Sequence, residues 1–212
     1  MLVGGSGLYV RAVLDVMEFP GTDAELRDQL EADLVRHGPE ALHARLAALA
    51  PQAAARIPVH NPRRVVRALE VVTLTGQVMG ELPPPTYALP ALQVGLRVPR
   101  DVLGQRVAAR VEVMWARGLV DEVRRLQDDG LRDGVTARRA LGYAQVLRLL
   151  DGEIDDAAAR EQTVNATRRF VRRQESWFLR DERISWLDPR EESTLDEACR
   201  LFAVACSRPV PA

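Results

Sequence analysis

Apolar side chains recur every three or four residues in the first quarter of the chain, and this spacing predicts two amphipathic helices. The apolar faces comprise Leu26, Leu30, Leu34 and Val35, followed by Leu42, Leu46 and Leu49. Residues 22–25 have the pattern of a capping box, which starts the first helix. His37 and Gly38 are expected to end it, and Pro39 to begin the second.

The pattern continues with an alanine-rich segment and a third helix. Residues 52–57 are expected to form a short turn. Asn61 and Pro62 offer an N-cap and a first-turn proline for a helix that closes at Gly76. Residues 80–90 contain three consecutive prolines, which predict a stiff, extended connector.

The second half of the chain combines two strand-like segments with long helical ones. Strands are expected over residues 91–98 and 184–187. Helices are expected over residues 101–117, 119–129, 138–150 and 155–180, and a terminal helix after a capping pattern at residues 194–197.

A glycine-rich turn stands at the start of the sequence. Leu2 and Val3 lead into Gly4-Gly5-Ser6-Gly7, and a helix is predicted over residues 8–16. Such a turn normally follows a buried strand and brings backbone N–H groups close to an anion. We therefore expect a strand at residues 2–3 that belongs to the same parallel sheet as residues 91–98, and a chain that is the downstream part of a larger protein.

These elements predict an α/β fold that is mostly helical and carries an all-helical insertion. The expected boundaries are residues 1–19 for the core strand, glycine turn and first helix, 20–90 for the helical insertion, and 91–212 for the rest of the core. No internal repeat is evident.

The overall composition neither supports nor excludes a polyanionic partner, so the distribution of charge along the chain is more informative. The formal net charge is -1, and all 29 basic residues are arginines. Residues 56–67 carry four arginines and no acid, whereas residues 18–40 are acidic. The sequence contains no signal-peptide or membrane-spanning pattern, which predicts a cytoplasmic protein. Cys199 and Cys206 lie too far apart on a predicted helix for a disulfide.

The densest functional signal lies at residues 163–180. Five arginines occur there with one acid, and Arg168, Arg169, Arg172 and Arg173 form like-charged pairs four residues apart. A polyanion would relieve their repulsion. Because Gln174 and Trp177 add an amide and an aromatic plane, RNA is the expected ligand. The alternative is that Trp177 lies in the core and the arginines pair with acidic neighbours.

Two further arginine pairs allow either a structural or a functional interpretation. Arg106 and Arg110 lie one helical turn apart and could form local ion pairs or contact phosphate. Arg138 and Arg139 are expected at a helix start, where they oppose the helix dipole unless an anion is present.

Other kinds of site find little support. His37, His43 and His60 are too scattered for a metal site, and His43 is expected to face solvent. Ser6 has no nearby base in the sequence. A Walker-type phosphate loop needs lysine, which the sequence lacks.

The order of several motifs resembles that of the tRNA dimethylallyltransferase family, also called tRNA isopentenyltransferases. The motifs are Val3-Gly4-Gly5-Ser6-Gly7-Leu8-Tyr9, Asn61-Pro62-Arg63-Arg64 through Arg67-Ala68-Leu69-Glu70-Val71, Gly118-Leu119 through Glu122-Val123, Arg139-Ala140-Leu141-Gly142-Tyr143, and Thr167-Arg168-Arg169 through Arg173-Gln174 with Trp177-Phe178. The resemblance runs through nearly the whole chain. It implies a partial P-loop-type parallel sheet core.

The resemblance also implies a reaction and its components. A dimethylallyl group is transferred from dimethylallyl diphosphate to N6 of the adenosine beside the tRNA anticodon, position 37. The family holds the diphosphate with a phosphate loop and Mg²⁺ and uses an Asp as general base. Those elements precede the glycine turn in the family's order, so we expect the present chain alone to have little activity. The expected partners are a tRNA anticodon stem-loop and the diphosphate, and the expected state is a monomer.

Residue roles follow from the same resemblance. Ser6 takes the place of a catalytic threonine, and Arg139 would neutralise charge on the departing diphosphate. The expected tRNA-binding residues are Arg27, Arg63, Arg64, Arg67, Gly142, Tyr143, Arg172, Arg173, Gln174 and Trp177. No metal ligand is assigned. Two alternatives stay open, a non-catalytic RNA-binding module and a helical protein–protein adaptor.

Overall fold

The computed structural model of the chain describes residues 1–78 and 82–207. These residues form two compact units, one made of residues 15–88 and the other of residues 1–14 and 89–212. The predicted boundaries, at residues 19/20 and 90/91, therefore differ slightly from this division. Most described residues are helical, and a small parallel sheet accompanies them, so the predicted fold class is confirmed.

The unit of residues 15–88 is a helical module. It consists of α2 (Ala24–Leu49), α3 (Pro51–Arg56) and α4 (Pro62–Thr75), and its fully buried side chains include Leu46, Val65 and Leu69. Asn61 accepts a hydrogen bond from the backbone N–H of Arg64, and Gly76 adopts a left-handed φ of 67°, as predicted for the two ends of α4.

Two local predictions in this module are wrong. Residues 52–57 are not a turn, because Pro51 begins a helix and the alanines after it favour helix. The N-cap of α2 is Asp23, whose carboxylate accepts the N–H of Leu26. Aspartate is the stronger N-cap of the two neighbouring candidates, so Thr22 does not start the helix. The break at Gly38 is confirmed by its φ of 80°.

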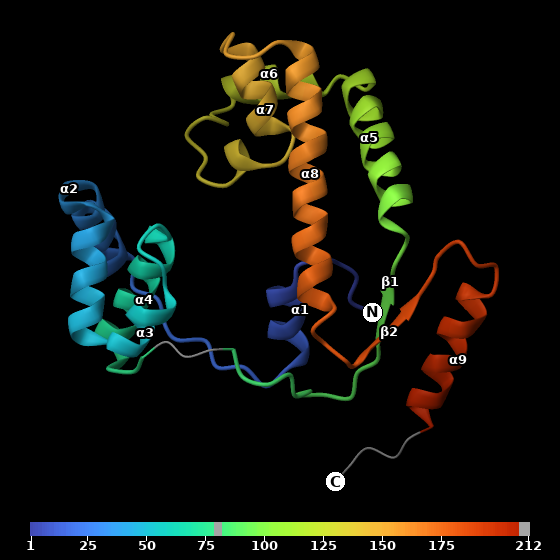
Figure 1. Cartoon of the computed structure of the whole chain (residues 1–212), viewed down its shortest axis with the longest axis horizontal. Helices are drawn as coiled ribbons and strands as arrows, with labels where there is room; N and C mark the ends of the chain where they lie inside the picture. The colour runs from blue at the N-terminus through green and yellow to red at the C-terminus, as the bar shows by residue number, and fades with distance from the viewer. Residues whose placement is uncertain (79–81, 208–212) are drawn as a thin grey trace. The chain divides into compact units, whose positions relative to one another are not determined.

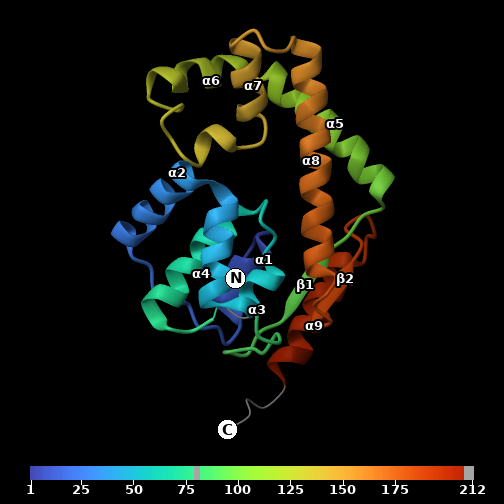
Figure 2. The ribbon, with the colours of Figure 1, turned by 60° about the vertical axis from the view of Figure 1, so that its left-hand side comes forward.

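The second unit combines a two-stranded parallel sheet with six α-helices among its described residues. Strands β1 (Gln93–Leu96) and β2 (Ile184–Leu187) pair in register from Gln93 opposite Ile184 to Leu96 opposite Leu187. The helices are α1 (Gly7–Leu14), α5 (Arg100–Ala116), α6 (Leu119–Asp128), α7 (Tyr143–Leu150), α8 (Asp156–Phe178) and α9 (Thr194–Cys206). Figure 1 shows α5 and α7 beside the long helix α8, and Figure 2 shows β1 and β2 side by side.

Several predictions for this unit need correction. Residues 2–3 form no strand, because a strand needs a hydrogen-bonded neighbour and β1 pairs only with β2 in the described part of the chain. The terminal helix has Ser193 at its N-cap, and the hydroxyl of Thr194 donates instead to the carbonyl of Asp188. Both cysteines are free, as predicted, and both are exposed.

Residues 80 and 81 of the predicted connector lie outside the described residues. The described part of the connector ends the helical module, where Asp15 and Tyr87 form an antiparallel bridge and the N–H of Val16 donates to the carbonyl of Thr86 at 2.8 Å. No helix in residues 1–78 and 82–207 is both long and apolar enough to cross a membrane.

Candidate functional site

The glycine turn packs against the C-terminal half of α8. The amide nitrogen of Gln174 donates a hydrogen bond to the carbonyl oxygen of Gly5 at 2.7 Å. The carbonyl of Ser6 accepts the N–H of Val10 at 2.9 Å as α1 begins. The structure therefore brings the segment of Ser6 next to Gln174, although the two were predicted from opposite ends of the sequence.

Two of the glycines are required by this packing. A Cβ atom on Gly5 would lie 1.8 Å from Nε2 of Gln174, and one on Gly7 would lie 1.9 Å from Nε1 of Trp177. A Cβ on Gly4 would meet no atom within 4 Å. Gly5 and Gly7 thus let the turn approach the amide and the indole closely, whereas Gly4 faces open space.

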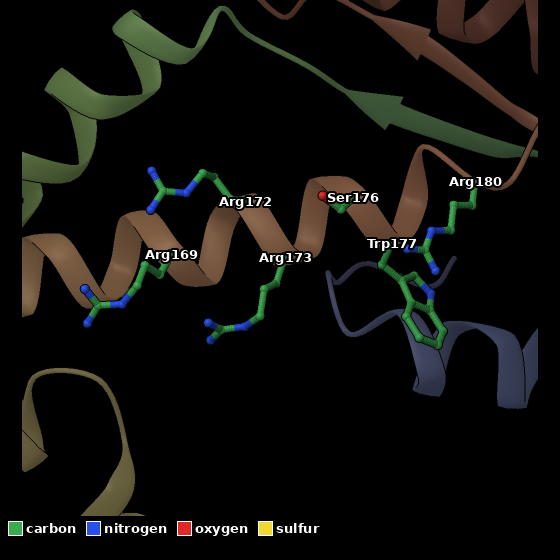
Figure 3. A pocket seen from close by; sticks show the side chains of 6 residues that line it. All are labelled: Arg169, Arg172, Arg173, Ser176, Trp177 and Arg180. Carbon is green, nitrogen blue, oxygen red and sulfur yellow. The ribbon is translucent and has the colours of Figure 1, made fainter. Parts of the chain in front are cut away.

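A groove of about 420 Å³ runs along α8 next to this contact. It is lined by Arg169, Arg172, Arg173, Ser176, Trp177 and Arg180. Figure 3 shows Arg169, Arg173 and Trp177 projecting to one side of α8 and Arg172 to the other, with the indole of Trp177 over the segment of α1.

The four guanidinium groups of this groove are free to bind an anion. None of them makes a hydrogen bond or ion pair with another residue in the described parts of the chain. Arg168, by contrast, donates to the carbonyl of Gly104 at 3.3 Å. Trp177 is half-buried against the glycine turn rather than enclosed in the core. The alternative in which these arginines pair with acids therefore has no support among the described contacts.

Arg138 and Arg139 occupy a place that the sequence did not predict. They lie in a short 3₁₀ turn, Ala137–Arg139, and α7 begins only at Tyr143 because Gly142 adopts a left-handed φ of 92°. The expected conflict with the dipole of α7 is therefore absent. The guanidinium of Arg138 donates to the carbonyl of Arg132 at 3.1 Å, whereas that of Arg139 contacts no described hydrogen-bonding partner.

Gly142 and Tyr143 hold this turn in place. The N–H of Gly142 donates to the side-chain oxygen of Gln145 at 2.9 Å. The hydroxyl of Tyr143 donates to the carboxylate of Glu122 on α6. That hydrogen bond, helped by burial, raises the pKa of Tyr143 above its ordinary value. Tyr143 thus uses its hydroxyl to anchor the segment that presents Arg139.

The helical module has its own arrangement of predicted binding residues. Arg27 and Arg67 contact the carboxylate of Glu70 at 2.5 and 2.7 Å, and Glu70 also accepts the N–H of Asp23 at 3.0 Å. Burial alone would raise the pKa of Glu70, but these hydrogen bonds outweigh it and the pKa lies below its ordinary value. The carboxylate is fully buried, so Glu70 anchors the start of α2 on α4.

Arg63 and Arg64 differ from the arginines that bind Glu70. Both are exposed on the first turn of α4, and their guanidinium groups have no hydrogen-bonding partner among the described residues. His43 was predicted to face solvent, and this prediction is wrong. Its Nε2 lies 3.1 and 2.8 Å from the carbonyl oxygens of Ala54 and Ile57 near the end of α3.

Sequence reasoning missed Glu70, Glu122 and Glu175 as organising residues. Glu175 binds two arginines, Arg97 and Arg100, and is the one acid among the five arginines of residues 163–180. That isolated negative charge was a usable signal. Glu70 stood among the apolar residues of a predicted helix, which was a second one.

Three carboxylates described above are engaged by neighbouring side chains. Glu70 and Glu175 bind arginines, and Glu122 accepts the hydroxyl of Tyr143. No group of three or more His, Cys, Asp or Glu side chains is gathered in residues 1–78 and 82–207.

Comparison with known proteins gives a consistent family. The model of the IPP transferase family matches residues 1–181. The tRNA dimethylallyltransferases of Thermobifida fusca and Kineococcus radiotolerans are 56% and 58% identical to the chain over 97% and 95% of its length. The chain spans 64% of the length of each of these relatives.

Solved structures agree. The full-length tRNA isopentenylpyrophosphate transferase of Bacillus halodurans is 34% identical with a TM-score of 0.61, and the match covers 95% of the chain and 65% of that protein. A eukaryotic dimethylallyltransferase acting on tRNA has a TM-score of 0.73 over 99% of the chain and 57% of its own length. At 21% identity, this second likeness shows a shared fold.

Proposed function

The chain belongs to the IPP transferase family, and from this premise we propose that it supplies the tRNA-binding surface and part of the prenyl-transfer site of a tRNA dimethylallyltransferase. In the proposed reaction, C1 of the dimethylallyl group leaves the oxygen of its diphosphate and bonds to N6 of adenosine 37. The N6 proton passes to a general base, and diphosphate departs.

The observation that carries the proposal is the basic groove on α8. Its lining combines four guanidinium groups without described partners and the indole of Trp177. The neighbouring amide of Gln174 donates to the glycine turn. Guanidinium groups bind phosphate oxygens, and an indole face stacks on an unpaired base. An anticodon loop offers both. The target adenosine must be unstacked to reach a reacting carbon.

Two residues receive roles near the reacting atoms. We assign the exposed hydroxyl of Ser6 to orientation of the acceptor and diphosphate. We assign the free guanidinium of Arg139 to charge on the departing diphosphate, an effect that is strongest where water is excluded. Both assignments rest on the family motifs. In the helical module, Arg63 and Arg64 would bind the stem with guanidinium groups that have no described partner. Arg27 and Arg67 would bind it while remaining paired with Glu70.

The proposal also covers cofactor, state and location. Dimethylallyl diphosphate is the proposed donor and Mg²⁺ the proposed metal. A monomer in the cytoplasm is proposed, in keeping with two free cysteines.

Binding to a fluorescent anticodon stem-loop tests the RNA part. The chain should bind with a steep salt dependence, with a slope of log K against log salt of about −3 if four arginines neutralise phosphates. The double change Arg172→Ala and Arg173→Ala should weaken binding and reduce that slope. Arg125→Ala removes an exposed arginine of α6 that has no described partner, and it should have little effect. Unchanged affinity in the double variant would favour a protein–protein adaptor.

A non-catalytic RNA-binding module remains the second candidate, because the groups that line the groove on α8 are all explained by RNA binding alone. Mass spectrometry of tRNA after incubation with the chain, dimethylallyl diphosphate and Mg²⁺ tests the second candidate, which predicts no product under any condition. We expect little or no product from these 212 residues alone. Addition of one dimethylallyl group would contradict that expectation.

A further inference from the structure

Glu175 is a negative charge in the basic C-terminal half of α8. It is the one acid in residues 163–180, which contain five arginines. If the surface of α8 binds a polyanion, simple electrostatics makes this carboxylate unfavourable. The residues that it binds suggest why it is there.

The carboxylate of Glu175 joins three elements of the core unit. Its Oε1 accepts Nε of Arg97 at 3.0 Å, and its Oε2 lies 3.3 Å from Nε and 3.2 Å from an outer nitrogen of Arg100. Arg97 follows β1 directly, and Arg100 is the first residue of α5. The single carboxylate therefore ties α8 to the junction between β1 and α5.

This anchor lies between the residues that meet the glycine turn. Gln174 precedes Glu175 and Trp177 follows it by two positions, so all three lie within one turn of α8. Successive residues of a helix point about 100° apart. A carboxylate held on one side of α8 consequently determines where the amide of Gln174 and the indole of Trp177 point.

We infer that Glu175 is a positioning residue, which with Arg97 and Arg100 sets the rotation of α8 so that its basic groove and Trp177 are presented correctly beside the glycine turn. The inference rests on the proposed RNA-binding function of α8. The side chain of Glu175 is 16% exposed, whereas those of Arg97 and Arg100 are 50% and 72% exposed. The carboxylate is thus the enclosed member of the network, and removing it releases both arginines.

Long-range electrostatics and the positioning role predict opposite changes in RNA affinity when the charge of Glu175 is removed. Glu175→Gln removes one negative charge, which by long-range electrostatics should tighten binding of an anticodon stem-loop. Positioning predicts the opposite, a roughly two- to fivefold weaker affinity. Its salt slope should also become shallower by about 0.7 to 0.9 for each phosphate that an arginine of the groove no longer neutralises.

A matched control lies on the same helix. Glu161→Gln makes the same change of charge at an exposed residue of α8 that has no described partner, and it should leave affinity unchanged or slightly improved. Glu175→Asp keeps the charge but shortens the reach to the two guanidinium groups. It should weaken binding, and it serves if Glu175→Gln does not fold.

The outcomes are distinguishable. Weaker binding and a shallower slope for the two Glu175 variants, with Glu161→Gln unaffected, support the inference. Tighter binding by Glu175→Gln, equal to that of Glu161→Gln, or unchanged binding by Glu175→Asp overturns the inference while the proposed function stands. If the unmodified chain binds no stem-loop, the proposed function and the inference fail together.

Discussion

Adding one methyl group to each glycine of the turn tests how closely α8 approaches it. In Gly7→Ala the new Cβ would lie 1.9 Å from Nε1 and 2.0 Å from Cδ1 of Trp177. The indole is rigid and must move away. In Gly5→Ala the new atom would lie 1.8 Å from the amide end of Gln174, which can swing aside. Gly4→Ala meets nothing within 4 Å.

These distances set the order of the effects. Displacing packed groups typically costs about 1–3 kcal/mol. The higher helix propensity of alanine offsets less than about 1 kcal/mol of this cost at the first residue of α1. Gly7→Ala should therefore lower the free energy of unfolding by roughly 1–2 kcal/mol. Gly5→Ala removes the 2.7 Å hydrogen bond from Gln174, worth about 0.5–1.5 kcal/mol. Gly4→Ala should be neutral or stabilising by up to about 1 kcal/mol, because it restricts the unfolded chain.

Thermal unfolding followed by circular dichroism measures the series. For a chain of this size, 1 kcal/mol corresponds to roughly 2–4 °C in Tm, which gives a decrease of about 2–8 °C for Gly7→Ala. Affinity for the stem-loop should fall most in Gly7→Ala, because that change displaces Trp177. It should fall less in Gly5→Ala, which displaces Gln174, and least in Gly4→Ala. Equal Tm values for Gly4→Ala and Gly7→Ala would refute the close packing of the turn on α8.

Two further predictions concern buried or half-buried carboxylates. Glu70→Gln should destabilise the helical module by about 1–3 kcal/mol at pH 7. Because the pKa of Glu70 is lowered in the folded state, the ionised carboxylate stabilises the fold at pH values above its ordinary pKa of 4.5. This stabilisation is lost as the pH falls through the lowered pKa. Urea unfolding should show the variant and the unmodified chain converging in acid, and a constant difference would contradict this. Tyr143→Phe and Glu122→Gln should each destabilise the second unit. The double variant should lose less stability than the two single losses added together, because both changes remove the same hydrogen bond. Additive effects would show that the pair is not coupled.

Local signals in the sequence located most elements. The caps of α4 at Asn61 and Gly76 were predictable because a cap involves only neighbouring residues. The start of α7 was not, since nothing in the composition of residues 138–142 reveals that Gly142 turns left-handed. Residues 2–3 looked like a strand, but strand formation depends on a neighbour that sequence pattern does not supply.

The candidate site shows the same division. The arginines and Trp177 of α8 could be found from spacing alone. Their lack of acidic partners, the hydrogen bond from Gln174 to Gly5 and the anchoring of Glu175 by Arg97 and Arg100 join residues far apart in the sequence. Such interactions depend on tertiary packing, so sequence periodicity could not reveal them.

The bridge between Asp15 and Tyr87 has a consequence for the order of folding. It joins the two ends of the helical module, so that module can close on itself while later residues are still being synthesised. Gly5 and Gln174 are 169 residues apart, but the closed module removes much of the flexible chain between them and lowers the entropic cost of bringing them together. The glycine turn must nevertheless wait for α8, so we expect the groove to be among the last parts of the molecule to form.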